Sequence, residues 1–554
     1  MAENAAPAAG IPALPVPFHV RILDPLTAYQ STVQAGVQPT AFVADTLLVR
    51  GRHERTVAAL EQVAAAAGFA LRWDPRGDRD DELLARSGLA PEPLAELQAV
   101  WVRRVQLVAA EKPPHSVFKP IDTWRLLQAY RVEVGKDRAR LADVGLEHPA
   151  AVSPVTQGHP VTQGHPVTQG HPVTQGHPVT QGHPAGLGIS AYTVPGWGGR
   201  QPVNWTGPAP TAAYPLDGTR HRPVVAILDT GIGKHPWLTK EFVHRDVTVL
   251  GERLGLPAAD AVAEAAGTDG SLLGELAQDA GHGTFIAGLV RQGCPEALLL
   301  DVRLYGDDGV VAEYDLLRNL QLLALRQLRA RTGKSKDAPV DVVALSLGYY
   351  HEQPGDAAFD ALLHGPIRLL GRYGAAVVVS AGNDASDRPS YPAAFAPYPG
   401  GVVKDQRDVV PVTAVGALNP DGSIALFSND GPWVAFHRPG ASLVSTMPTT
   451  YDASLEPSQA VRNARGELRA SFDQDDFSSG FGIWSGTSFA APVFAGQLAA
   501  RLAGEYGDGA ADLGRDASVE RMRRLVRTMP GRRRPAAAKK AAAKRAATRK
   551  GARA

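Results

Sequence analysis

Between residues 223 and 415, short apolar runs alternate with longer amphipathic stretches, and few folds accommodate such a pattern. Apolar runs of strand length lie at residues 223–228, 297–304, 340–347, 374–380 and 409–415. Helical patterns separate them at residues 283–290, 313–331 and 358–373. Continuous apolar strands joined by helices are typical of a parallel sheet that is covered on both faces. We therefore predict an α/β fold, a doubly wound and mostly parallel sheet with helices on both faces.

Four polar residues are candidates for a functional site, and sites in such a sheet form at the carboxyl ends of strands. Asp229 and Asn383 follow two of the apolar runs, whereas His282 and Ser488 each open a helical pattern. Taken singly, each has an ordinary interpretation as a turn or cap residue. Together they supply a nucleophile, a base, a carboxylate that orients the base and an oxyanion donor.

The segments around these residues, in this order, resemble the subtilisin family of serine proteases (subtilases). The resemblance covers roughly residues 200–505. The matching segments are Ile227-Leu-Asp-Thr-Gly-Ile, Gly281-His-Gly-Thr, Ala381-Gly-Asn and Gly486-Thr-Ser-Phe-Ala-Ala-Pro, with weaker support from Ser346-Leu-Gly, Phe427-Ser-Asn and Pro439-Gly440.

The resemblance implies a serine endopeptidase that acts through an Asp-His-Ser triad and an acyl-enzyme intermediate. It makes Asp229, His282 and Ser488 catalytic and places Asn383 in the oxyanion hole. Substrate-binding residues implied by the resemblance are Ser346, Leu347, Gly348, Ser380, Ala381 and Gly382. The expected partner is a protein or peptide substrate. Two alternatives stay open: a protease that its N-terminal domain holds inactive until a partner triggers it, and a peptide-binding protein without hydrolytic activity.

The first 150 residues carry no catalytic constellation. Residues 1–37, rich in Ala, Pro and Gly, are expected to be poorly ordered, apart from a strand near residues 17–23. Residues 38–150 predict an accessory α/β domain, which is either a prodomain or a recognition domain. Its expected strands lie at residues 41–49 and 69–73, and its expected helices at residues 54–67, 92–109 and 122–132.

Residues 151–185 are predicted to be a linker, because residues 155–184 repeat Val-Thr-Gln-Gly-His-Pro five times. Proline and glycine at this density favour an extended, solvated chain. The regularly spaced histidines also permit a metal-binding interpretation. We favour the linker, since the sequence supplies no closed coordination shell.

The peptidase domain is expected to span residues 186–530, with an insertion near residues 449–479. This insertion carries Asp473, Asp475 and Asp476, and it is interpreted as a surface lid, an acidic subsite for basic substrates or a solvated loop. Subtilases often bind calcium, but the sequence gives no ligand set to which calcium can be assigned. The prediction is therefore that no cofactor and no metal site can be named.

Residues 531–554 are predicted to be a disordered basic tail, since residues 532–554 contain ten Lys or Arg and no acidic residue. Such a tail can contact nucleic acid or another polyanion without sequence specificity. The helical pattern at residues 518–528 adds further arginines to this basic stretch.

The remaining sequence features bear on the compartment. Cys294 is the single cysteine, so the chain has no intramolecular disulfide framework. No signal peptide is evident at the N-terminus, and no run of 18 apolar residues predicts a membrane span. These features favour a cytoplasmic location.

Overall fold

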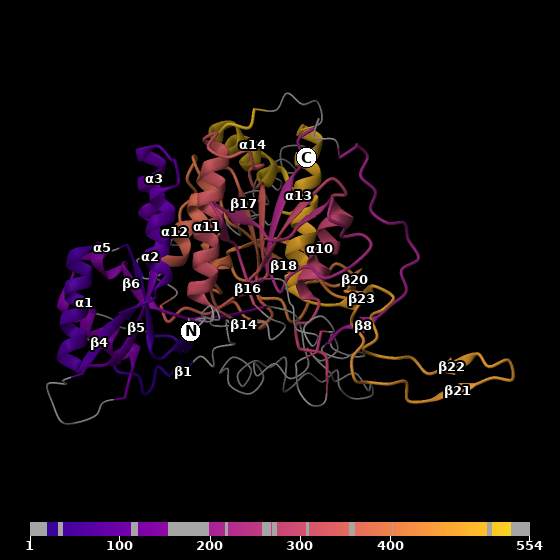
Figure 1. Cartoon of the computed structure of the whole chain (residues 1–554), viewed down its shortest axis with the longest axis horizontal. Helices are drawn as coiled ribbons and strands as arrows, with labels where there is room; N and C mark the ends of the chain where they lie inside the picture. Colours follow the sequence, from indigo (N-terminus) through magenta and orange to yellow (C-terminus); the bar gives the residue numbers. More distant parts are fainter. Residues whose placement is uncertain are drawn as a thin grey trace, which may run out of the picture.

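A computed structural model of the chain places a smaller N-terminal domain against a larger α/β domain (Figure 1). It describes residues 19–30, 37–51, 53–111, 120–152, 199–216, 220–257, 267–268, 274–305, 310–353, 361–401, 403–506 and 512–532. The histidine repeats and the basic tail from residue 533 onward lie outside the described residues.

A seven-stranded parallel sheet forms the centre of the larger domain. Its strand order is β10-β13-β9-β15-β17-β18-β19. The bounds are β10 (Val243–His244), β13 (Leu298–Arg303), β9 (Val224–Asp229), β15 (Val342–Leu345), β17 (Ala376–Ser380), β18 (Thr413–Leu418) and β19 (Val434–Pro439). Most strands begin and end within two residues of the predicted apolar runs, but β18 is shifted about four residues toward the C-terminus.

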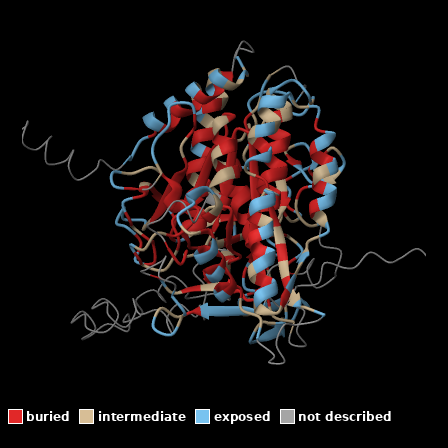
Figure 2. Cartoon of the chain, turned by 90° about the vertical axis from the view of Figure 1, so that its left-hand side faces the viewer, coloured by how far each residue is buried: buried red, intermediate tan, exposed pale blue. Residues whose placement is uncertain are grey.

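Helices cover both faces of this sheet, because successive side chains of each strand point to opposite faces. On β9, Val224, Ala226 and Leu228 belong to a core shared with α11 (Glu313–Arg331) and α12 (Ala361–Arg372). Val225 and Ile227 point to the other core, which includes α10 (His282–Gly293), α13 (Thr487–Tyr506) and α14 (Arg515–Thr528). Figure 2 shows buried residues concentrated on the sheet and on the inner faces of the helices. The prediction of a doubly wound parallel sheet is confirmed.

The N-terminal domain has a four-stranded antiparallel sheet in the order β4-β5-β3-β6 and a separate core. Its strands are β1 (Val20–Leu23), β2 (Thr40–Val43), β3 (Thr46–Arg50), β4 (Phe69–Trp73), β5 (Val102–Ala109), β6 (Val144–Leu146) and β7 (Pro149–Val152). Its helices are α1 (Glu54–Ala67), α2 (Arg76–Ala85), α3 (Pro91–Gln98), α4 (Thr123–Val134) and α5 (Arg138–Leu141).

One predicted helix in this domain is wrong over its second half. The sequence predicts a helix over residues 92–109, but α3 ends at Gln98 and residues from Val102 onward form strand β5. Leu97, Trp101 and Val105 mimic a helical stripe. In the structure, Val102, Val105 and Leu107 are buried in two cores, and β5 pairs on both sides with β3 and β4.

The two domains share a buried interface along α11 and α12, at the left of Figure 1. Leu97 and Trp101 of the N-terminal domain belong to the same core as the helices of the larger domain. Ion pairs border this apolar contact: Arg318 Nη2 lies 2.8 Å from Asp80 Oδ1, and Arg372 Nη2 lies 2.9 Å from Glu96 Oε1. The N-terminal domain is therefore packed as an integral part of the molecule.

Two further features lie at the edges of the larger domain. The predicted insertion contains a hairpin, β21 (Ala460–Arg462) and β22 (Leu468–Ala470), that extends away from the body at the lower right of Figure 1. In α14, Arg523 contacts the carbonyls of Gln406 and Val409, and Arg524 pairs with Glu505. These arginines are engaged within the protein. In the part of the chain that the structure describes, no helix has the length and apolar character needed to cross a membrane.

Candidate active site

Asp229 and His282 meet at the carboxyl end of strand β9. Asp229 is the last residue of β9, and His282 is the first residue of α10. His282 Nδ1 lies 2.7 Å from Asp229 Oδ1. Both side chains are buried, and the carboxylate also accepts from the Thr230 N–H at 2.8 Å. The Tyr305 hydroxyl lies 3.3 Å from Asp229 Oδ2. This arrangement holds the imidazole in one orientation with Nδ1 toward the carboxylate.

Glycines on both sides of His282 allow this close approach. Gly281 caps α10 with φ of 82°, in the left-handed region. A Cβ on Gly283 would lie 2.4 Å from the carbonyl oxygen of Gly231, so only glycine fits where the helix begins against the end of β9. The Gly283 N–H donates to Thr230 Oγ1 at 2.9 Å and fixes the contact. Close packing against Gly231 therefore explains the glycine at position 283 of the Gly-His-Gly-Thr segment, and the contact with Asp229 explains the histidine.

Ser488 is the second residue of α13, near the positive end of the helix dipole. Its hydroxyl donates to the Ser346 carbonyl at 3.4 Å, and the Ser346 hydroxyl donates to the Ser488 carbonyl at 2.9 Å. The His282 ring lies 5.1 Å from the ring of Phe489, the next residue of the helix. His282 Nε2 is buried and has no hydrogen-bond partner among the described residues. Ser488 and His282 therefore lie in one buried region, without a hydrogen bond between them.

Asn383 is fixed by Thr487, the residue before Ser488. Asn383 Oδ1 accepts from the Thr487 N–H at 2.9 Å and from the Thr487 hydroxyl at 2.8 Å. The hydroxyl of Thr487 also accepts from the Gly382 N–H at 3.1 Å. These bonds tie the turn after β17, which follows Ser380 and includes Ala381, to the start of α13. They direct the amide nitrogen end of the Asn383 side chain away from Thr487.

The segment that the resemblance assigns to substrate binding is paired within the chain. Strand β16 (Leu347–Gly348) pairs antiparallel with β7, the last described strand before the repeats. On its other side, β7 pairs antiparallel with β14 (Val310–Ala312). Gly348 is opposite Ala151, and Val311 is opposite Ala150, which is buried. Strand β7 of the N-terminal domain therefore pairs with the strand that directly follows Ser346, and Ser346 is hydrogen-bonded to Ser488.

His148, the residue just before β7, is surrounded by buried polar and charged side chains. His148 Nδ1 lies 2.8 Å from Glu313 Oε2, and His148 Nε2 lies 3.2 Å from Glu352 Oε2. The Tyr349 ring stacks on the His148 ring at 4.7 Å, and the Tyr349 hydroxyl donates to Glu313 at 2.9 Å. Arg131 of α4 lies 3.5 Å from Glu352. We call these five residues, with His351, the His148 cluster.

Charges in the His148 cluster stabilise one another across the two domains. Burial alone lowers the pKa of His148, but Glu313 and Glu352 outweigh it and raise the pKa to about 10. Burial likewise raises the pKa of Glu352, but His351, His148 and Arg131 hold that pKa well below its usual range. His148 is thus a cation between two carboxylates at neutral pH. The sequence did not reveal this cluster, because its members are far apart in the chain and their only common signal is charge.

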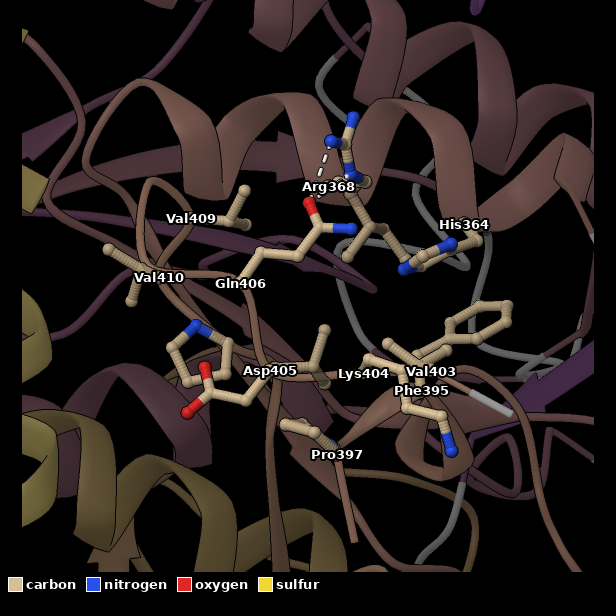
Figure 3. Close-up of a pocket in the computed structure, with 13 residues that line it drawn as sticks. His364, Arg368, Phe395, Pro397, Val403, Lys404, Asp405, Gln406, Val409 and Val410 are labelled. Carbon is tan, nitrogen blue, oxygen red and sulfur yellow. Dashed lines mark hydrogen bonds between the residues drawn. The ribbon is translucent and has the colours of Figure 1, made fainter. Parts of the chain in front are cut away.

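A separate pocket lies between α12 and the segment before β18 (Figure 3). His364 and Phe395 line it, with ring centroids 4.8 Å apart. Arg368 donates two hydrogen bonds, of 2.7 and 3.1 Å, to Gln406 Oε1 across it. Burial lowers the pKa of His364 to about 4, with a smaller contribution from Arg368. None of its lining residues belongs to the Asp229–His282–Ser488 group, so the pocket is not part of the candidate active site.

Comparison with protein families decides the identity of the larger domain. Residues 220–541 match the subtilase family, over more than half of the chain. The chain belongs to the subtilase family. The match includes Asp229, His282, Asn383 and Ser488 and leaves the N-terminal domain outside.

Two curated relatives match this subtilase over shorter stretches. The major intracellular serine protease of Bacillus subtilis (strain 168) is 25% identical over 214 residues, which cover 36% of this chain and 57% of the relative. Halolysin of Haloferax mediterranei is 25% identical over 236 residues, which cover 41% of this chain and 36% of the relative. The chain therefore spans less than two thirds of each relative's own length.

Two solved structures also resemble the subtilase. A cold-adapted subtilisin-like serine proteinase is 18% identical with a TM-score of 0.32, covering 53% of this chain and 85% of its own. A serine-to-alanine mutant of the protease domain of PatA is 20% identical with a TM-score of 0.34, covering 55% of this chain and 86% of its own.

Proposed function

We propose that this subtilase is a serine endopeptidase that acts through Asp229, His282 and Ser488. The observation that carries the proposal is the 2.7 Å contact between His282 Nδ1 and Asp229 Oδ1. It favours the tautomer in which Nδ1 holds the proton and Nε2 keeps its lone pair. Nε2 is buried without a hydrogen-bond partner among the described residues, and it is the atom that a general base offers to a nucleophile.

The proposed reaction begins when Ser488 Oγ attacks the carbonyl carbon of a peptide bond. His282 Nε2 takes the hydroxyl proton, and Asp229 stabilises the resulting imidazolium. The proton then passes to the leaving amine, so the peptide C–N bond breaks and an acyl-enzyme ester remains. Water, deprotonated by the same imidazole, hydrolyses the ester and restores the Ser488 hydroxyl.

The oxyanion of each tetrahedral intermediate is proposed to accept from the Ser488 N–H and from Asn383 Nδ2. The Ser488 N–H belongs to the first turn of α13, where backbone donors lack intrahelical acceptors. The oxygen of the Asn383 amide is engaged by Thr487, so the nitrogen is the end that can donate to substrate. Backbone pairing with Leu347 and Gly348 is the proposed means of holding the peptide.

Asn383→Ala is expected to lower kcat by about 10²–10³-fold with little change in KM, because the lost hydrogen bond forms mainly in the transition state. Steady-state kinetics on a chromogenic peptide measure both constants. Asn463→Ala, in the turn of the β21–β22 hairpin, is the matched control and should leave kcat unchanged. A large rise in KM at constant kcat would show that Asn383 holds the ground state instead.

We further propose that the N-terminal domain holds this enzyme in a locked form. Strand β7 occupies the backbone positions of β16 and β14 that an extended peptide would need. Ser488 and His282 are both fully buried in this arrangement. The His148 cluster fixes the residue that enters β7, and the shared core along α11 holds the domain in place. These contacts favour an inhibitory role over a separate recognition domain.

The lock is expected to weaken as pH rises. The pKa of His148 is raised above its unfolded value, so its stabilisation is complete below about pH 6.5 and declines until about pH 10. Hydrogen exchange of the amides of residues 150–152, corrected for the intrinsic rate, measures this in the Ser488→Ala chain between about pH 6.5 and 9.5. Protection should fall over this range. His148→Gln should remove the pH dependence, and an unchanged dependence in that variant would contradict the assignment.

A further inference from the structure

The insertion before Ser488 brings three carboxylates together at the base of its hairpin. Asp452 precedes β21, whereas Asp473 and Asp475 follow β22, so the group joins both limbs of the insertion. One oxygen from each carboxylate lies within 4.8 Å of the other two. Neighbouring residues anchor both limbs: Tyr451 and Phe477 belong to one buried core, and the Phe477 N–H donates to the Tyr451 carbonyl at 2.8 Å.

One carboxylate of this group, that of Asp475, is buried. Asp475 is only 1% exposed, and its Oδ1 is buried with no hydrogen-bond partner among the described residues. Its Oδ2 accepts from the Leu455 N–H, at 2.9 Å. Within the described ranges, no Lys, Arg or His side chain forms an ion pair with any of the three carboxylates. A buried carboxylate without a counter-charge is costly, and a cation between the three oxygens removes that cost.

The spacing and the ligand type indicate which cation fits. Calcium binds carboxylate oxygens at about 2.4 Å, so oxygens on opposite sides of the ion are about 4.8 Å apart. The three oxygens of this group lie within 4.8 Å of one another, so one cation can be shared among them. Magnesium demands a near-ideal octahedron at about 2.1 Å, whereas calcium accepts irregular sets of carboxylate oxygens. We propose that Asp452, Asp473 and Asp475 bind a calcium ion that closes the base of the β21–β22 hairpin.

The expected consequence of calcium binding is local order that extends to the active-site region. The ion links residues about twenty positions apart in the chain. It therefore reduces the conformational entropy of the insertion when its two limbs separate, and this favours the closed hairpin base. The limb that carries Asp475 continues through Phe477 into β23 (Phe481–Trp484), which leads directly to Ser488. Trp484 packs against His282 with ring centroids 5.7 Å apart. Calcium thus stabilises the insertion and the strand that precedes the nucleophile.

Calcium titration of the full-length Ser488→Ala chain tests the site without interference from proteolysis. Isothermal titration calorimetry should detect one calcium ion per chain. Calcium at about 5 mM, compared with EDTA, should raise Tm by about 2–5 °C. Magnesium should bind at least about tenfold more weakly. Equal responses to both ions would overturn the calcium assignment, and the absence of binding heat and of any Tm shift would overturn the site.

Two variants and a control make the test specific. Asp475→Asn and Asp452→Asn should each abolish the calcium-dependent rise in Tm. In EDTA, Asp475→Asn should melt no lower than the parent, because Asn can still accept from Leu455 while the unpaired charge is gone. Asp421→Asn carries the same charge change at an exposed turn outside the group and keeps its contact with the Ser423 N–H, so it should respond to calcium like the parent. Identical responses in all three variants would overturn the proposal. None of these readouts depends on peptidase activity.

Discussion

Ser488→Ala is expected to reduce peptidase activity by about 10⁶-fold, the size typical of nucleophile loss in a subtilisin-type triad. The variant retains Asp229, His282 and both oxyanion donors, but no oxygen is left to form the ester. The fold should persist, since the Ser488 hydroxyl makes one long hydrogen bond, to Ser346. The measurement is kcat on a peptide substrate, together with the intact mass after incubation with a fluorophosphonate probe.

The matched control is Ser454→Ala, at an exposed position in the insertion, which should keep wild-type activity. Wild type should gain one probe adduct and Ser488→Ala none. Wild-type turnover in Ser488→Ala would refute the assignment of the nucleophile. A wild-type chain that never reacts with the probe, even without its N-terminal domain, yet binds peptides tightly would instead favour the non-hydrolytic alternative.

His148→Ala is expected to accelerate probe labelling of Ser488 in the uncut full-length chain by roughly 10²-fold. The substitution leaves Glu313 and Glu352 buried without the cation between them. Removal of one partner from a buried ion pair costs about 3–5 kcal/mol, and each 1.4 kcal/mol is a tenfold change in population. We expect most of this cost to appear as release of β7, because His148 immediately precedes that strand.

A histidine outside the interface provides the control. His244→Ala changes an exposed residue of β10 and should leave the labelling rate unchanged. The thermal midpoint of each variant separates release of β7 from global unfolding. The lock is contradicted if wild-type full-length protein already reacts as fast as a chain that begins near residue 186, because β7 would then not restrict access to Ser488.

Local sequence patterns were sufficient for much of the fold. Helix α1 begins and ends where its apolar face and Gly68 predict, with Gly68 in the left-handed conformation. Helix α11 also has its predicted bounds, because a long amphipathic pattern has few alternatives. Strand β5 was mistaken for a helix, since its apolar residues continue the spacing of α3. Its strand conformation depends on pairing with β3 and β4, which no local pattern records.

The candidate active site was predictable to a similar extent. The resemblance implied that Asp229 orients His282, and in the structure the two side chains lie 2.7 Å apart. Strand β7 was not predicted, because a four-residue segment that begins with a proline gives almost no strand signal and both its partners are distant in the chain. The His148 cluster and the three carboxylates of the insertion likewise arise from packing between distant segments.

The pairing of β7 with β16 has a kinetic consequence. A segment held in the cleft by its own chain is present at an effective concentration that dilution does not change. Any first cleavage next to β7 within one chain should therefore be unimolecular, with a rate constant independent of protein concentration. After that cleavage, the N-terminal domain becomes a separate molecule, and its occupancy of the cleft becomes a bimolecular equilibrium that dilution shifts toward the free enzyme.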